Sequence, residues 1–144
     1  MLGELNKRAI IDLLENNFIG RIGCHADGET YIAPINYIYR DSAIYAHSGP
    51  GKKIDMMRKT PKVCFQVDEI DDTFRWQSII VQGNYEELSG AERQQALQEL
   101  IKAISSRRDK ASQGPSHAID PVHQQELIVY RIRIQEASGR YEAH

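Results

Sequence analysis

A short glycine-rich loop followed by two lysines is the stretch whose residue types could bind an anion. The loop begins at Ser48, and Lys52 and Lys53 stand in the first turn of a helix predicted after it. Backbone amides at a helix start attract negative charge, whereas lysines there are unfavourable unless an anion is bound. We therefore consider a phosphate site at this loop, with an ordinary solvated turn as the alternative. Its candidate residues are Ser48, Gly51, Lys52 and Lys53.

A second candidate is a predicted strand that carries a proline. The segment from Tyr31 to Tyr37 is rich in β-branched and aromatic residues, and Pro34 in its middle has no N–H to donate. Backbone groups left exposed near Pro34 and Asn36 could bind a flat heteroaromatic ring. An edge strand protected against aggregation is the alternative.

A third candidate is the start of another predicted strand. Trp76 and Ser78 alternate along it and therefore share one face with Ile80. The tryptophan could stack on a ligand ring or serve only as a packing anchor.

The sequence contains no motif that is typical of a metal site or a hydrolase. The five histidines are scattered, with no cysteine or carboxylate at ligand spacing, so we predict no metal site. A hydrolase is equally unsupported, because Ser48 lies in no G-x-S-x-G turn and neither cysteine has an identified base. His47, at the end of a predicted strand and next to the loop, is the one histidine close to a candidate site.

Composition limits the class of protein. The chain has 144 residues and a formal net charge of −2, with 41% hydrophobic residues, so we expect one globular domain over residues 1–144. A weakly acidic chain is a poor nucleic-acid binder, and no apolar run is long enough to span a membrane. The lone Cys24 and Cys64 predict reduced thiols in a cytoplasmic protein.

Hydrophobic periodicity predicts the elements that position these residues. The predicted helices span Leu5 to Asn17, Lys52 to Lys59, and a segment beginning at the capping-box sequence Ser89 to Glu92. The predicted strands span Phe18 to His25, Thr30 to Tyr39, Ala43 to His47, Lys62 to Asp68, Arg75 to Glu87, and Leu127 to Ala137. An acidic loop from Glu69 to Phe74 and a polar, mobile crossover from Arg107 to Val122 are also expected.

Most of these strands are joined by short turns, which favours antiparallel pairing over a doubly wound parallel sheet. The expected fold is mainly β: a six-stranded antiparallel barrel with peripheral helices.

Six ordered motifs, spread over nearly the whole chain, resemble the pyridoxamine-phosphate-oxidase-like flavoproteins, specifically their nitroimidazole-resistance branch. The motifs are Ile19 to Gly23, Ala33 to Tyr37, Tyr45 to Ser48, Gly51 to Met57, Pro61 to Phe65, and Trp76 to Gly83.

This resemblance implies a six-stranded split β-barrel that forms a homodimer with FMN at the subunit interface. It implies that Ser48, Lys52 and Lys53 hold the FMN phosphate. It also implies that Pro34, Asn36 and Tyr37 line the isoalloxazine ring, with Trp76 and Ser78 approaching from a neighbouring strand. His47 would lie near the flavin as a substrate-side catalytic candidate.

The expected function is an oxidoreductase that passes electrons from NADH or NADPH to a small acceptor such as a nitroaromatic. The chain has no G-x-G-x-x-G fingerprint, so a nicotinamide would bind only transiently, stacked on the flavin. Two alternatives remain open: a non-enzymatic FMN-storage or redox-sensing module, and a haem-binding split barrel. The C-terminal residues 139–144 lack the substrate-binding tail typical of pyridoxamine phosphate oxidase itself, which argues against vitamin B6 synthesis.

Overall fold

The computed structural model describes residues 1–107 and 126–143, and within them the chain is mainly β. The elements are β1 (Leu2–Glu4), α1 (Lys7–Glu15), β2 (Ile19–Ala26), β3 (Glu29–Asn36), β4 (Ile38–Arg40), β5 (Ala43–Ser48), α2 (Lys52–Lys59), β6 (Lys62–Asp72), β7 (Arg75–Glu87), α3 (Gly90–Arg107) and β8 (Ile128–Glu142). The predicted crossover lies outside the described residues from position 108 onward.

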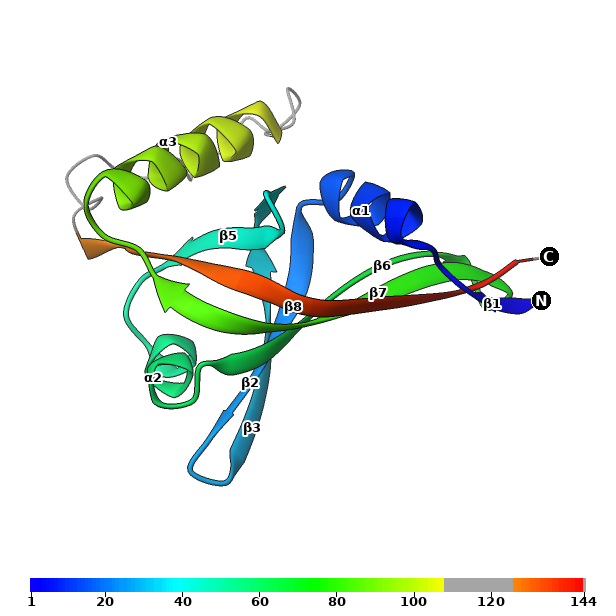
Figure 1. The fold of residues 1–144 in the computed structure, drawn as a ribbon, viewed down its shortest axis with the longest axis horizontal. Helices are drawn as coiled ribbons and strands as arrows, with labels where there is room; N and C mark the ends of the chain where they lie inside the picture. The colour runs from blue at the N-terminus through cyan, green and yellow to red at the C-terminus, as the bar shows by residue number, and fades with distance from the viewer. Residues whose placement is uncertain (108–125, 144) are drawn as a thin grey trace.

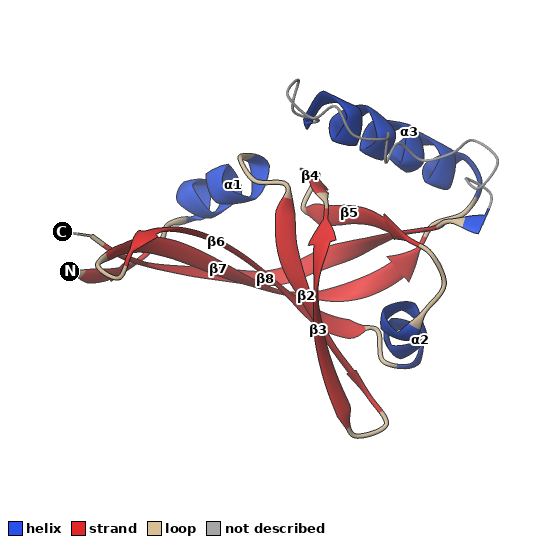
Figure 2. Cartoon of the chain, turned by 180° about the vertical axis from the view of Figure 1, so that it is seen from behind, coloured by secondary structure: helices blue, strands red, loops and turns tan. Residues whose placement is uncertain are grey.

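The strands form one antiparallel sheet in the order β3-β2-β6-β7-β8-β5-β4, and β1 pairs with the far end of β8. The sheet curls strongly, and the helices lie around it (Figures 1 and 2). Its two edge strands, β3 and β4, are consecutive in the sequence but do not pair with each other. The sheet therefore remains open between them. The predicted antiparallel split barrel with peripheral helices is confirmed, although the described residues contain eight strands where six were predicted.

Tyr37 is the reason why one predicted strand becomes two. Its N–H donates to the Phe18 carbonyl at 3.0 Å, and its hydroxyl donates to the Leu14 carbonyl at 2.7 Å. The side chain is fully buried, with its ring edge-on to Phe65 at 4.9 Å between centroids. These contacts interrupt the strand predicted over Thr30 to Tyr39 and separate β3 from β4.

We expect Tyr37→Phe to lower the free energy of unfolding by about 1–2 kcal/mol, because the buried Leu14 carbonyl then loses its donor. The ring and its contact with Phe65 are retained, so packing should change little. Urea unfolding followed by circular dichroism measures the change. An unaltered midpoint would show that water replaces the hydroxyl at no cost.

The acidic segment predicted as a loop is instead mostly strand. β6 continues to Asp72, and the register with β7 shifts between Ile70 and Asp72. Glu69 to Asp72 are exposed, so this end of the strand has no buried face and shows no alternating pattern. Pairing with β7 holds it, and the turn shrinks to Thr73 and Phe74. β8 likewise runs beyond its predicted end to Glu142.

α3 packs on the side of β5 and β8 that faces away from the main core. Leu97 and Leu100 are buried there in a small second cluster with Val129. The predicted helix start is confirmed to within one residue. Glu92, the acidic residue of the predicted capping box, forms an ion pair with Arg131 at 3.1 Å. In the part of the chain that is described, no helix is long and apolar enough to cross a membrane.

Candidate functional site

The structure distributes the predicted site residues over three places. The first is the junction between the end of β5 and the start of α2, which carries His47, Ser48, Gly51, Lys52 and Lys53. The second is β3, with Pro34 and Asn36, and the third is the start of β7, with Trp76 and Ser78.

The start of α2 leaves its backbone amides without a side-chain cap. Gly51 is the N-cap and makes no side-chain cap hydrogen bond. Ser48, at the end of β5, donates its hydroxyl to the Gly49 carbonyl at 2.8 Å and lies within the same turn. The amides at this helix end are therefore available to an anion.

The two lysines at this helix start have different surroundings. The Lys52 ammonium is exposed and forms an ion pair with Glu29 at 2.6 Å, which raises the Lys52 pKa. Lys53 is half-buried, and burial lowers its pKa; the nearby Cys24 thiol opposes that shift weakly. Lys53 has no ion-pair partner among residues 1–107 and 126–143.

A second ion pair joins α2 to the β2–β3 hairpin. Lys59 contacts Asp27 at 2.8 Å, and the turn at Asp27 and Gly28 has positive φ at both residues. Together, the Lys59–Asp27 and Lys52–Glu29 pairs hold the hairpin tip against one side of α2. A pocket of about 390 Å³ lies between the hairpin tip and α2.

His47 carries a buried polar atom at this junction. Its Nε2 atom is buried and has no hydrogen-bond partner among the described residues. Burial lowers the His47 pKa, and the positive charge of Lys53 lowers it further. The imidazole is therefore neutral at pH 7, with Nε2 free to accept or donate one hydrogen bond.

This pKa shift predicts a pH dependence of stability. With a folded-state pKa below the ordinary value, the unfolded chain binds a proton first as the pH falls below about 6.5, so acid destabilises the fold. We expect His47→Gln to reduce the drop in Tm between about pH 7 and pH 5. Thermal scans at both values, with exposed His25→Gln as the control, measure it; an identical drop in wild type and His47→Gln would contradict the shift.

Pro34 and Asn36 project from β3 on the side that faces away from the core. We name this side of β2, β3, β6 and β7 the outer face. Its central residues are Ile19, Arg21, Ile32, Pro34, Asn36, Gln66, Ser78 and Ile80. β3 pairs only with β2 among the described strands, so its other edge presents unpaired backbone groups. Pro34 therefore lies in an edge strand, as predicted.

Tyr37 does not join Pro34 and Asn36. Its ring is buried in the core, and its hydroxyl donates to the Leu14 carbonyl.

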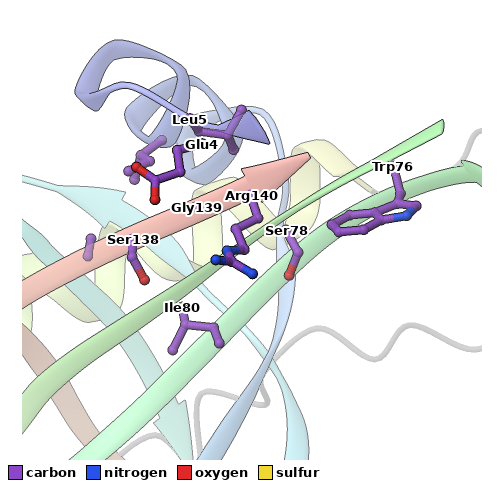
Figure 3. Close-up of a pocket in the computed structure, with 10 residues that line it drawn as sticks. Glu4, Leu5, Trp76, Ser78, Ile80, Ser138, Gly139 and Arg140 are labelled. Carbon is purple, nitrogen blue, oxygen red and sulfur yellow. The ribbon is translucent and has the colours of Figure 1, made fainter. Parts of the chain in front are cut away.

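Trp76 and Ser78 line a groove of about 560 Å³ formed with the end of β8 (Figure 3). Ser78 lies opposite Arg140 in the strand register, and both line the groove. The Ser78 hydroxyl is 3.0 Å from Nε2 of Gln66, which is also 3.0 Å from Asp68. The groove shares no lining residue with the pocket beside α2.

Sequence reasoning missed Arg140 and Ser138 in this groove. Their segment was placed beyond the end of the last predicted strand. The alternation of Ser138 and Arg140 around Gly139 was the available signal, but it had no flanking hydrophobic run to support it.

Comparison with known proteins assigns the chain to a family. The sequence profile of the pyridoxamine 5'-phosphate oxidase family matches residues 6–141. The chain belongs to this family. The resemblance seen in the six sequence motifs is thereby confirmed.

Several proteins of known structure or sequence are similar to this family member. An uncharacterized protein of Rhizobium meliloti is 33% identical over 127 residues, which cover 85% of this chain and 83% of the relative. A crystal structure described as a FAD-binding protein of Mesorhizobium loti is 32% identical, with a TM-score of 0.82 and 99% of both chains covered. A candidate 5-nitroimidazole antibiotic resistance protein of Bacteroides thetaiotaomicron shares the fold, with 19% identity, a TM-score of 0.76, and 98% and 87% coverage of the two chains.

Proposed function

We propose that this member of the family is a flavoprotein that holds the flavin phosphate at the start of α2. The observation that carries the proposal is Lys53, a half-buried ammonium without a carboxylate partner among the described residues. A buried cation is unfavourable unless an anion accompanies it. Lys53 adjoins the uncapped amides at the start of α2. A phosphate there would neutralise the ammonium and accept hydrogen bonds from the amides, with Ser48 as a further donor.

The proposed cofactor is FMN. The similarity to the FAD-binding protein of Mesorhizobium loti supports a flavin and makes FAD the alternative. Both carry the same ring and a phosphate at the same position of the ribityl chain, so the α2 site suits either.

The flavin ring is proposed to lie along the free edge of β3, near Pro34 and Asn36. Unpaired backbone N–H and C=O groups at that edge match the alternating donors and acceptors of a flavin's pyrimidine side. A bound flavin supplies two-electron redox chemistry; the chain supplies the binding and the local electrostatics. His47 is proposed as a neutral hydrogen-bonding group on the substrate side.

A homodimer through the outer face completes this proposal. Ile19, Ile32 and Ile80 are 48%, 67% and 47% exposed on a sheet surface, where water contact with apolar side chains is unfavourable. A second copy would cover them and bring Trp76 and Ser78 of one protomer toward the flavin of its partner. That arrangement would unite residues that a single chain keeps apart.

The activity we propose is electron transfer from a reduced nicotinamide to a small acceptor, including nitroaromatics. A non-enzymatic flavin carrier uses the same binding residues and differs only in turnover. Free Cys24 and Cys64 support a reducing, cytoplasmic location.

The deciding experiment is the visible spectrum of the purified protein, before and after incubation with FMN and removal of the excess. A retained flavin spectrum is expected, and chromatography of the released cofactor distinguishes FMN from FAD. A haem spectrum, or no retained chromophore after incubation with either flavin, would overturn the proposal. Oxidation of NADH or NADPH faster than with free FMN separates an enzyme from a carrier, and light scattering during gel filtration tests the dimer.

A further inference from the structure

Arg107, the last residue of α3, reaches the break between β3 and β4 at the open side of the sheet. That end of the helix lies toward α1 in Figure 1. The Nη1 atom of Arg107 donates to the Tyr37 carbonyl at 3.1 Å, and the guanidinium carbon lies 5.1 Å from the centre of the Phe18 ring. Tyr37 directly follows Asn36, the last residue of β3. The guanidinium is therefore held beside the end of β3.

The positive charge of Arg107 has no carboxylate partner in the part of the chain that is described. The side chain is half-buried, and burial lowers its pKa, but a guanidinium stays protonated in proteins. Glu69 acts on the same Tyr37 hydroxyl, yet its two carboxylate oxygens accept hydrogen bonds from Asn17 and Gln77. A partly buried cation without a partner favours an anionic group beside it.

Lys53 and Arg107 lie toward opposite ends of β3. Burial raises the Cys24 pKa and the nearby charge of Lys53 opposes that rise, so Lys53 is close to Cys24. Cys24 pairs with Tyr31 of β3 in the strand register. From Tyr31 to Asn36 the strand extends about 16 Å, at about 3.3 Å per residue. The flavin proposed above would lie along this length, with its phosphate toward Lys53 and the pyrimidine side of its ring toward Arg107.

A cation at that end of the ring has a chemical consequence. When a nicotinamide gives up a hydride and is oxidised, a flavin gains two electrons and one proton, and its pyrimidine side carries one additional negative charge. The oxidised ring is neutral there. A positive charge beside the pyrimidine side therefore stabilises the reduced form more than the oxidised form.

We propose that Arg107 raises the reduction potential of the bound flavin by placing its positive charge beside the pyrimidine side of the ring. The inference rests on the proposed function, because it takes the ring to lie along β3. It goes beyond that function by giving α3 a part in the redox chemistry, although none of the six sequence motifs includes a residue of this helix.

The midpoint potential of flavin bound to the whole protein tests this role. We would load wild type, Arg107→Gln, Arg107→Lys and Lys102→Gln with FMN, and reduce each together with a reference dye of known potential while recording both spectra. Glutamine removes the charge but keeps an N–H donor for the Tyr37 carbonyl, whereas lysine keeps the charge. Lys102→Gln removes an exposed positive charge from the same helix and is the matched control.

We expect Arg107→Gln to weaken the binding of reduced flavin about tenfold more than that of oxidised flavin. For a two-electron couple, this tenfold ratio lowers the midpoint potential by about 30 mV. Arg107→Lys should keep most of the wild-type potential, and Lys102→Gln should leave it unchanged. Affinity for oxidised flavin, measured by quenching of flavin fluorescence, should change little in all three variants.

An unchanged potential in Arg107→Gln would overturn the inference. Equal losses of affinity for the two redox forms would overturn it as well, because a purely structural contact gives that result. So would an equal shift in Arg107→Lys, since the charge would then not be the cause. Each of these results comes from flavin-loaded protein and leaves the flavin site standing. Failure to retain any flavin would instead overturn the proposed function, and this inference with it.

Discussion

Flavin affinity should fall about ten- to a hundredfold in Lys53→Met, whereas the matched Lys52→Met should change it severalfold at most. The difference follows from the partners of the two lysines. The Lys52 ammonium is already engaged by Glu29, while Lys53 is half-buried beside the uncapped start of α2. A charge-assisted contact to phosphate is worth about 1.5–3 kcal/mol, which is the range of the expected loss.

Methionine is chosen because it keeps the length and apolar stem of lysine while removing the charge. Without flavin, Lys53→Met should unfold at the same temperature as wild type or higher, because a desolvated ammonium has been removed. Quenching of flavin fluorescence on binding gives the affinities, and thermal scans of flavin-free protein give the stabilities. Equal losses in the two variants would contradict the distinction, and unchanged affinity in both would contradict the phosphate site.

Phe65→Ala should be the most destabilising of the substitutions considered, with a loss of about 3–5 kcal/mol in the free energy of unfolding. Phe65 is completely buried in the middle of β6. Its ring touches the edge of Tyr37 and lies directly over Gly20, where any Cβ would collide with it. Alanine would leave a cavity shared by β2 and β6 that neither backbone can close.

Urea unfolding at constant protein concentration measures this loss, with Phe65→Leu as the control. Leucine refills most of the volume and should cost about 1–2 kcal/mol. Because Phe65 lies on the core face of its strand, opposite the outer face that carries Pro34, Asn36 and Ser78, flavin affinity of the folded fraction should stay close to that of wild type. A loss below 1 kcal/mol for alanine would show that the neighbouring strands collapse into the space.

The sequence allowed the hairpins to be predicted because their turns are local. Asp27 and Gly28, and likewise Asp41 and Ser42, adopt the positive φ values that join neighbouring strands tightly. The split at Tyr37 could not be predicted in this way. It depends on hydrogen bonds to Phe18 and Leu14, residues that only the folded chain brings within reach.

The candidate site shows the same division between local and distant information. The helix start with Ser48 and Lys53 is contiguous in sequence, so the proposed anion site could be predicted from the residue types. The unequal roles of Lys52 and Lys53 were not, because Glu29 reaches Lys52 from a hairpin 23 positions earlier in the chain. Arg140 was missed because the covered face of this part of β8 carries Ala137, Gly139 and Tyr141, which do not form a hydrophobic run in the sequence.

The ion pairs that join α2 to the β2–β3 hairpin have a consequence for exchange of the proposed cofactor. Lys52–Glu29 and Lys59–Asp27 are exposed, so dissolved ions weaken them over the roughly 10 Å screening distance of 0.1 M salt. These pairs hold the hairpin against α2, beside the pocket that Gly51 and Lys52 line at the proposed phosphate site. Ionic strength would therefore set how often the hairpin opens, and thus how fast a cofactor leaves. Relatives with the same core could differ in cofactor residence time through charge at these four positions alone.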